Sequence, residues 1–135
     1  MLVTDVGVRL PAHLTASGLA MLSALPATQV RALYPDRASF VQRSGGGPRS
    51  LAELRSVLTR TRTDGYAREE GTVTTDLSSV AVPVLDRAGR PLAAIALTLR
   101  TPDAGAEHVA ELVTRARLAA EDISRRLSPS PTGRR

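Results

Sequence analysis

Two apolar segments, SVAVPVL at residues 79–85 and LAAIALTL at residues 92–99, decide the fold of this chain. Short runs of this kind predict β-strands, and the link DRAGRP between them supplies hairpin-turn chemistry through Asp86 and Gly89. Both segments are apolar on both faces, so we expect a sheet covered on both sides by helices or by a partner subunit. Pro83 cannot donate one ladder bond, which places its strand near an edge or at a bulge.

Helices are predicted before and after this hairpin. Ser50 and Glu53 form a capping box, and the helix that follows should end before Gly65, whose missing Cβ suits a left-handed position. A longer helix spans residues 106–127. Its apolar residues recur on one face: Val109, Leu112, Val113, Ala116, Ala120, Ile123 and Leu127. Two ion pairs at i,i+4 spacing are expected on its outer face: Glu111–Arg115 and Glu121–Arg125.

The N-terminal part predicts one strand and two short helices. Apolar residues alternate at positions 6, 8 and 10, which is the period of a half-buried strand, and Pro11 ends it. Thr15 or Ser17 can cap a helix that runs to Leu25, and a second helix covers residues 28–33. Residues 66–70 predict a short strand, residues 71–76 a polar loop, and residues 128–135 a disordered tail. The order indicates an α+β domain with a small antiparallel sheet.

Composition excludes several classes of protein. The 135 residues suit one domain with an aliphatic core, because 42% are hydrophobic and only 2% aromatic. The absence of cysteine excludes disulfides and thiolate metal sites, and the sequence contains no signal peptide or membrane-length apolar run, so we expect a cytoplasmic protein. The net charge of +5 comes from arginine alone, spread along the chain, which favours a solvated surface over DNA binding.

No pattern for catalysis, metal binding or a cofactor stands out. His13 and His108 are the only histidines, and neither lies in a nucleophile or metal motif. We expect His108 on the surface and His13 in a structural hydrogen bond to the backbone. The glycine triplet at residues 45–47 lacks the spacing of a phosphate-binding loop. The segment PAHLTASGLAML places Thr15, Ser17 and Gly18 at a helix start, which is either a plain cap or a site for a carboxylate.

Four blocks in one order give this chain a family resemblance. The first block has Pro11, His13, Thr15, Ala16, Gly18 and Ala20; the second has Gly65, Tyr66, Ala67, Glu69 and Glu70. The third has Val80, Ala81, Pro83, Val84, Asp86, Gly89, Ala93 and Ala94; the fourth has Ala120, Ile123, Ser124 and Leu127. Over residues 4–127 the chain resembles the C-terminal effector-binding domain of the IclR family of bacterial transcriptional regulators.

The resemblance implies a GAF-like (profilin-like) sandwich, in which an antiparallel sheet is flanked by helices, over residues 1–127. It also implies a pocket for a small carboxylate effector. The pocket residues that it implies are Thr15, Ala16, Ser17, Gly18, Glu69, Asp76, Ser79 and Thr98. Helix-end amides and hydroxyls would bind the carboxylate, and a neutral or hydrogen-bonded Glu69 would bind a hydroxyl or aldehyde. An ionised Glu69 would instead repel the carboxylate.

Some positions depart from the family pattern. Leu19 stands where the family has Lys, Asp76 where it has Gly, and Ala96 where it has Ser. We also expect that the chain lacks the family's winged helix–turn–helix and one or more sheet strands, which leaves a sheet edge to pair with another chain.

The sequence therefore predicts a ligand-sensing domain that is not an enzyme. It would bind a small organic acid and respond by self-association as a homo-oligomer, or by association with a full-length relative. It would not bind DNA directly and has no membrane partner. The alternatives are a dimerisation module without a ligand and a basic DNA-binding protein.

Overall fold

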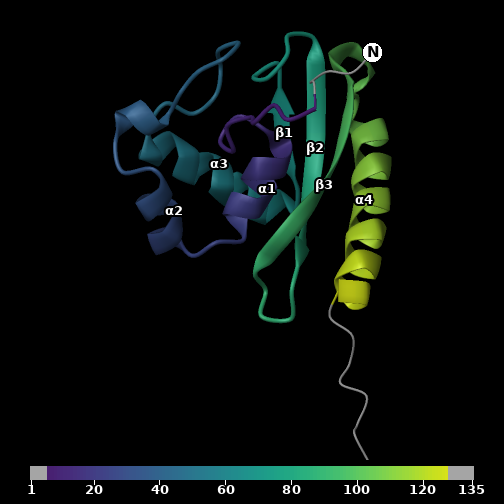
Figure 1. Cartoon of the computed structure of the whole chain (residues 1–135). Coiled ribbons are helices and arrows are strands. Elements are labelled where there is room, and N and C mark those ends of the chain that lie inside the picture. Colours follow the sequence, from purple (N-terminus) through teal and green to yellow (C-terminus); the bar gives the residue numbers. More distant parts are fainter. Residues whose placement is uncertain (1–5, 128–135) are drawn as a thin grey trace, which may run out of the picture.

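The computed structural model describes residues 6–127. This part of the chain holds four α-helices and a three-stranded antiparallel sheet (Figure 1). The elements are α1 (Ala16–Ser23), α2 (Ala27–Leu33), α3 (Leu51–Asp64), β1 (Ala67–Glu70), β2 (Leu77–Leu85), β3 (Pro91–Arg100) and α4 (Ala106–Leu127). Two short 3₁₀ turns lie at Arg37–Ser39 and Thr101–Asp103. The α+β class and the antiparallel sheet flanked by helices are confirmed. The expected tail, residues 128–135, lies outside the described residues.

The β2–β3 hairpin is the centre of the sheet, as the sequence predicts. In its turn, Asp86 Oδ1 accepts the N–H groups of Ala88 and Arg90, each at 2.9 Å, and Gly89 has a φ of 77°. The strand order is β1-β2-β3, so β2 is the central strand and not an edge strand. Pro83 is nevertheless tolerated, because β1 begins opposite Ala81 and leaves Pro83 with a neighbour only in β3. A register shift follows directly, between Val84 and Leu85.

Helices cover both faces of β2. One face packs against α4, through contacts among Val80, Val82, Val84, Val109, Val113, Ala116 and Ala120. The other face packs against α1, and α3 covers the far side of α1 with Leu54 and Leu58 (Figure 1). The molecule therefore has α4, the sheet, α1 and α3 as successive layers.

The helices of the described residues cover β3 only in part, and cover by a partner subunit stays a prediction. This strand pairs only with β2 among the described residues, so its outer edge lacks a partner strand. The side chains of Ile95, Leu97 and Leu99 pack only partly against α4, and Leu92 is 49% exposed. An apolar sequence on both faces predicted burial, but helix α1 is only eight residues long and leaves part of the edge strand open.

The strand expected at residues 6–10 is wrong for the described residues. Residues 6 and 7 form a turn, in which Gly7 has a φ of 88°, and residues 8–10 are irregular. Val6 is 99% exposed. A strand needs a neighbouring ladder to satisfy its backbone groups, and none of the three strands pairs with this segment.

The predicted starts of α1 and α3 and the predicted end of α3 are confirmed, whereas α1 ends at Ser23 and not at Leu25. Thr15 Oγ1 accepts the N–H of Gly18 at 2.9 Å, so Thr15 and not Ser17 is the cap of α1. Ser50 Oγ accepts the N–H of Glu53 at 3.2 Å, and the φ of 80° at Gly65 ends α3 in the left-handed region.

Helix α4 has the predicted bounds but different surface ion pairs. Glu111 faces His108 Nδ1 at 3.9 Å, and Arg125 lies 3.6 Å from Asp122. The expected pairs Glu111–Arg115 and Glu121–Arg125 are not among the ion pairs of the described helix, because Glu111 lies near His108 and Arg125 near Asp122, each at i,i+3 spacing. The buried stripe also ends at Ala120, since Ile123 and Leu127 are 36% and 57% exposed.

Candidate functional site

A row of three alanines lets helix α1 lie close to the sheet. Ala67, Ala81 and Ala96 are register partners across β1, β2 and β3. Ala67 and Ala81 are fully buried in one cluster with Ala16 and Ala20 of α1. Because a methyl group is the largest side chain on either side, the helix backbone approaches the strands closely.

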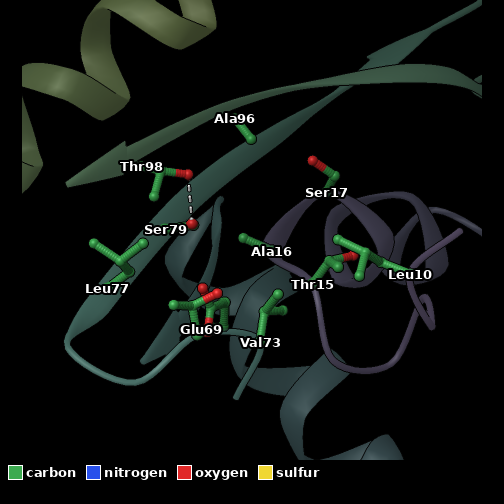
Figure 2. Close-up of a pocket in the computed structure, with 11 residues that line it drawn as sticks. Leu10, Thr15, Ala16, Ser17, Glu69, Val73, Leu77, Ser79, Ala96 and Thr98 are labelled. Carbon is green, nitrogen blue, oxygen red and sulfur yellow. Dashed lines mark hydrogen bonds between the residues drawn. The ribbon is translucent and has the colours of Figure 1, made fainter. Parts of the chain in front are cut away.

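The next row of the same face is polar. Glu69, Ser79 and Thr98 are register partners two residues along from the alanines, so one carboxyl and two hydroxyl groups stand side by side. Ser79 Oγ and Thr98 Oγ1 are 2.8 Å apart and share a hydrogen bond (Figure 2). This polar row lies beside the alanine row on the same face of the sheet.

A cavity of about 180 Å³ lies between this polar row and the start of α1. Figure 2 shows Thr15 and Ser17 on the helix side, with Ser79 and Thr98 across from them on the sheet. The remaining walls are formed by Leu10, Ala16, Glu69, Val73, Thr74, Leu77 and Ala96. Glu69 is the one charged side chain in this lining.

Hydrogen bonds hold Glu69 in place. Its Oε2 accepts the backbone N–H of Thr72 at 3.1 Å and lies 2.8 Å from the Thr72 hydroxyl. The same hydroxyl lies 2.6 Å from the carbonyl oxygen of Leu14, the residue before the cap of α1. Glu69 is 7% exposed and Thr72 is 9% exposed. Thr72 therefore ties the carboxyl group to both the loop after β1 and the entry into α1.

The start of α1 offers backbone donors. Thr15 satisfies two N–H groups, because its Oγ1 accepts from Gly18 and its carbonyl oxygen accepts from Leu19. The N–H groups of Ala16 and Ser17 precede them and have no acceptor within residues 6–127, as expected for the first turn of a helix. Together with the helix dipole they favour an anion on this side of the cavity.

The structure brings six of the eight candidate residues to this cavity: Thr15, Ala16, Ser17, Glu69, Ser79 and Thr98. Gly18 and Asp76 are not part of its lining. That any of the eight binds a ligand stays a prediction. The sequence analysis missed the apolar walls at Leu10, Val73 and Leu77. The position of residues 71–76 between two paired strands was the signal that could have placed Val73 here.

Gly18 and Asp76 have structural roles instead. A Cβ on Gly18 would lie 2.1 Å from the carbonyl oxygen of Ala12, so only glycine lets α1 pass the chain that precedes it. Asp76 has a φ of 68° and is the one non-glycine residue of the described chain in the left-handed region. Its side chain is exposed, and its carbonyl oxygen accepts the N–H of Thr101 at 2.9 Å.

The two histidines lie as expected. His13 is 2% exposed, its Nε2 donates to the carbonyl oxygen of Val41 at 2.7 Å, and its ring meets Tyr34 and Phe40 edge-on. Burial raises the pKa of the Tyr34 phenol, against a smaller lowering from the backbone of His13. His108 is exposed on α4. Neither histidine lines the cavity.

A second cavity of about 440 Å³ lies between α4 and the far end of β2. Its charged lining residues, Arg117, Glu121 and Arg125, are all exposed, which makes it a surface groove. Within residues 6–127 no helix is long and apolar enough to cross a membrane, and no three acidic, histidine or cysteine side chains form a group that could hold a metal ion.

Comparison with known proteins identifies the family. The model of the bacterial transcriptional regulator IclR C-terminal family matches residues 1–125. The glycerol operon regulatory protein of Streptomyces coelicolor is 32% identical over 96 residues, which are 71% of this chain and 37% of that protein. The Pca regulon regulatory protein of Pseudomonas putida is 32% identical over 91 residues, which are 67% of this chain and 31% of that protein.

A solved structure has the same fold as this chain. The repressor BlcR of Agobacterium tumefaciens superimposes with a TM-score of 0.80 at 30% identity, over 90% of this chain and 49% of that one. The chain therefore spans about a third of the curated relatives and about half of BlcR. These relatives are transcriptional regulators and not enzymes. The chain belongs to the IclR family of bacterial transcriptional regulators and carries the C-terminal domain of that family.

Proposed function

We propose that this chain is a cytoplasmic effector-sensing domain that binds a small organic acid between helix α1 and the sheet. The observation that carries the proposal is the cavity itself, where helix-start N–H groups face a row of side-chain hydroxyls. These donors suit a carboxylate, and the apolar walls suit a short carbon chain. At about 180 Å³ the cavity is smaller than the roughly 300 Å³ at which pockets for drug-sized ligands begin, so the effector is a small metabolite.

Ser79→Ala tests the site. The substitution removes a hydroxyl from the polar row, and we expect carboxylate binding to weaken by about 1 kcal/mol, or roughly fivefold in Kd. Ser78→Ala is a matched control, because Ser78 is also buried, lies on the opposite face and shares a hydrogen bond with Thr101 at 2.9 Å. Titration calorimetry with an acid that raises the Tm of the wild type measures both. Equal affinities for wild type and Ser79→Ala would show that the Ser79 hydroxyl does not contribute to binding.

We propose that binding is transmitted through a change of self-association or of association with a full-length relative. The cavity and the open edge of β3 share residues, since Thr98 and Ala96 lie on the outermost strand of the described sheet. A ligand held against β3 can therefore alter how that edge meets another chain. Sedimentation velocity with and without the acid tests this. An unchanged profile would show that the acid binds without changing self-association.

A second candidate function is dimerisation without a ligand. The open edge of β3 favours it, because a ten-residue strand with unpaired ladder groups is a template for another chain. This function predicts a stable dimer that no small acid shifts in a thermal melt.

A further inference from the structure

Helix α4 has one face on the sheet and the opposite face in solvent. Figure 1 shows it as the outermost layer of the described chain. The middle of its outward face is Leu118, which is 62% exposed. Six residues share that face with Leu118 at helical spacing, and the seven together form what we term the outer α4 face: Glu111, Thr114, Arg115, Glu121, Asp122 and Arg125. The outer α4 face therefore has one apolar residue at its centre and charges of both signs around it.

The charges at the two ends of the outer α4 face are loosely held within the chain. Glu111 lies 3.9 Å from His108, and its side chain is 72% exposed. Arg125 lies 3.6 Å from Asp122, and its side chain is also 72% exposed. Contacts of this length between exposed charges add little to stability. Both side chains can therefore turn to a partner without giving up a strong contact.

The outer α4 face repeats every seven residues. Three lines run along it, each with members seven positions apart: Glu111, Leu118 and Arg125 in the middle, Arg115 and Asp122 on one flank, and Thr114 and Glu121 on the other. A seven-residue repeat keeps such lines facing a neighbouring helix when two helices wind around each other. Each line therefore meets the equivalent line of a second copy when two such faces pack together.

An antiparallel second copy matches the charges of these lines. With Leu118 opposite Leu118 of the second copy, position 111 of one helix meets position 125 of the other, so Glu111 faces Arg125. On the flank, Arg115 faces Asp122 in the same way. Two-fold symmetry makes each of these contacts occur twice, so every charged pair joins opposite signs. A parallel second copy would instead put Glu111 against Glu111 and Arg125 against Arg125.

We propose that the outer α4 face binds the same face of a second copy of this chain, antiparallel and two-fold symmetric about Leu118. This surface is separate from the edge of β3, and it goes beyond the proposed function because it needs no ligand. Glu111 and Arg125 are only about 21 Å apart along the helix, so the contact is small and the association weak. Because its charges are exposed, salt weakens the association further.

Reversing single charges tests the proposal, since Glu111 and Arg125 are too far apart to meet within one chain. Glu111→Arg alone and Arg125→Glu alone each bring like charges together twice. We expect each to weaken self-association at low salt by about tenfold. The two variants mixed in equal amounts should associate as tightly as the wild type, because each reversed charge then meets the other. Sedimentation velocity over a concentration series, without any acid, measures Kd.

Arg55→Glu is the matched control for net charge, because Arg55 is exposed on α3. This variant should associate as the wild type does, and mixed with Glu111→Arg it should not restore the wild-type Kd. Leu118→Glu provides a second test, because it puts two carboxylates together at the symmetry axis. It should weaken self-association by at least about tenfold. All of these positions are exposed, so the variants should keep the Tm of the wild type at a concentration where the chain is monomeric.

Three results would overturn the proposal. A wild-type chain that stays a monomer at low salt and high concentration would show that the outer α4 face does not bind a second copy. Self-association that neither single reversal weakens would place the contact elsewhere, for example at the edge of β3. Weakening that the mixture of the two variants does not restore would exclude the antiparallel arrangement. None of these results bears on acid binding in the cavity, so the effector site is tested separately.

Discussion

Gly18→Ala perturbs the close contact between helix α1 and the chain segment that precedes it. The added Cβ would lie 2.1 Å from the carbonyl oxygen of Ala12, 2.5 Å from its Cα and 2.6 Å from its carbonyl carbon. All three are backbone atoms, so no side chain can turn away, and the two segments must separate by about 1 Å. Overpacking of this kind costs about 3 kcal/mol, whereas alanine gains about 1 kcal/mol in helix propensity. We expect a net loss of about 2 kcal/mol in the free energy of unfolding.

Thermal and urea unfolding of the purified chain measure this loss, which corresponds to a fall of roughly 6–10 °C in Tm for a domain of this size. Gly105→Ala is the control, because nothing lies within 4 Å of its added Cβ, and it should cost at most about 1 kcal/mol as a helix cap. The displaced helix start should also weaken acid binding in Gly18→Ala. A Gly18→Ala protein as stable as the wild type would mean that α1 does not pass Ala12 this closely.

Two further predictions concern backbone strain and alkaline pH. Asp76→Gly should be more stable than Asp76→Ala by about 1 kcal/mol in urea unfolding, because the φ of 68° is strained for alanine and free for glycine. Equal stabilities would show that the backbone at position 76 is not strained. The pKa of Tyr34 is raised by burial, so the folded state holds this proton more tightly than the unfolded state does, and stability should fall as the pH rises above 10. Tm measured from pH 8 to 11 should show this fall in the wild type and a smaller one in Tyr34→Phe; an equal fall in both would place the titrating group elsewhere. The chain has no lysine to obscure the effect.

Short-range sequence patterns were sufficient to predict most of the helices and strands. The Asp86–Gly89 turn joins two strands by short-range chemistry, and the capping box at Ser50 and the glycine at position 65 define α3 without reference to the rest of the chain. Helix α4 follows from its apolar spacing. These elements form because their signals lie within a few residues of one another.

Two of the differences from the sequence prediction concern partners that are distant in sequence. Residues 6–10 alternate as a strand does, but pairing depends on a neighbouring ladder that the described residues do not provide. Strand β3 is apolar on both faces, yet only three-dimensional packing shows that the short helix α1 leaves it partly open. The ion pairs on α4 are a local difference. Several opposite charges lie within one helical turn of each other, and their spacing in the sequence does not decide which two form a pair.

For the candidate site, the family resemblance supplied the polar residues that the cavity brings together. It did not supply the walls, because apolar positions such as Leu10, Val73 and Leu77 carry no chemical signature of their own. Gly18 also belonged to a matching motif, but the structure gives it a steric role that only the approach of Ala12 reveals.

The most direct test of the account is to map where a small acid binds. Amide chemical shifts of the ¹⁵N-labelled chain, followed during titration with a small acid that raises the Tm of the wild type, report each backbone N–H separately. We expect the largest changes at Ala16 and Ser17, with smaller ones at Ser79 and Thr98, saturating at a single Kd. Changes centred on Arg117 and Ser124 in the groove beside α4 would contradict this site, and the absence of a saturable change with any small carboxylic acid of a panel would contradict the sensing function.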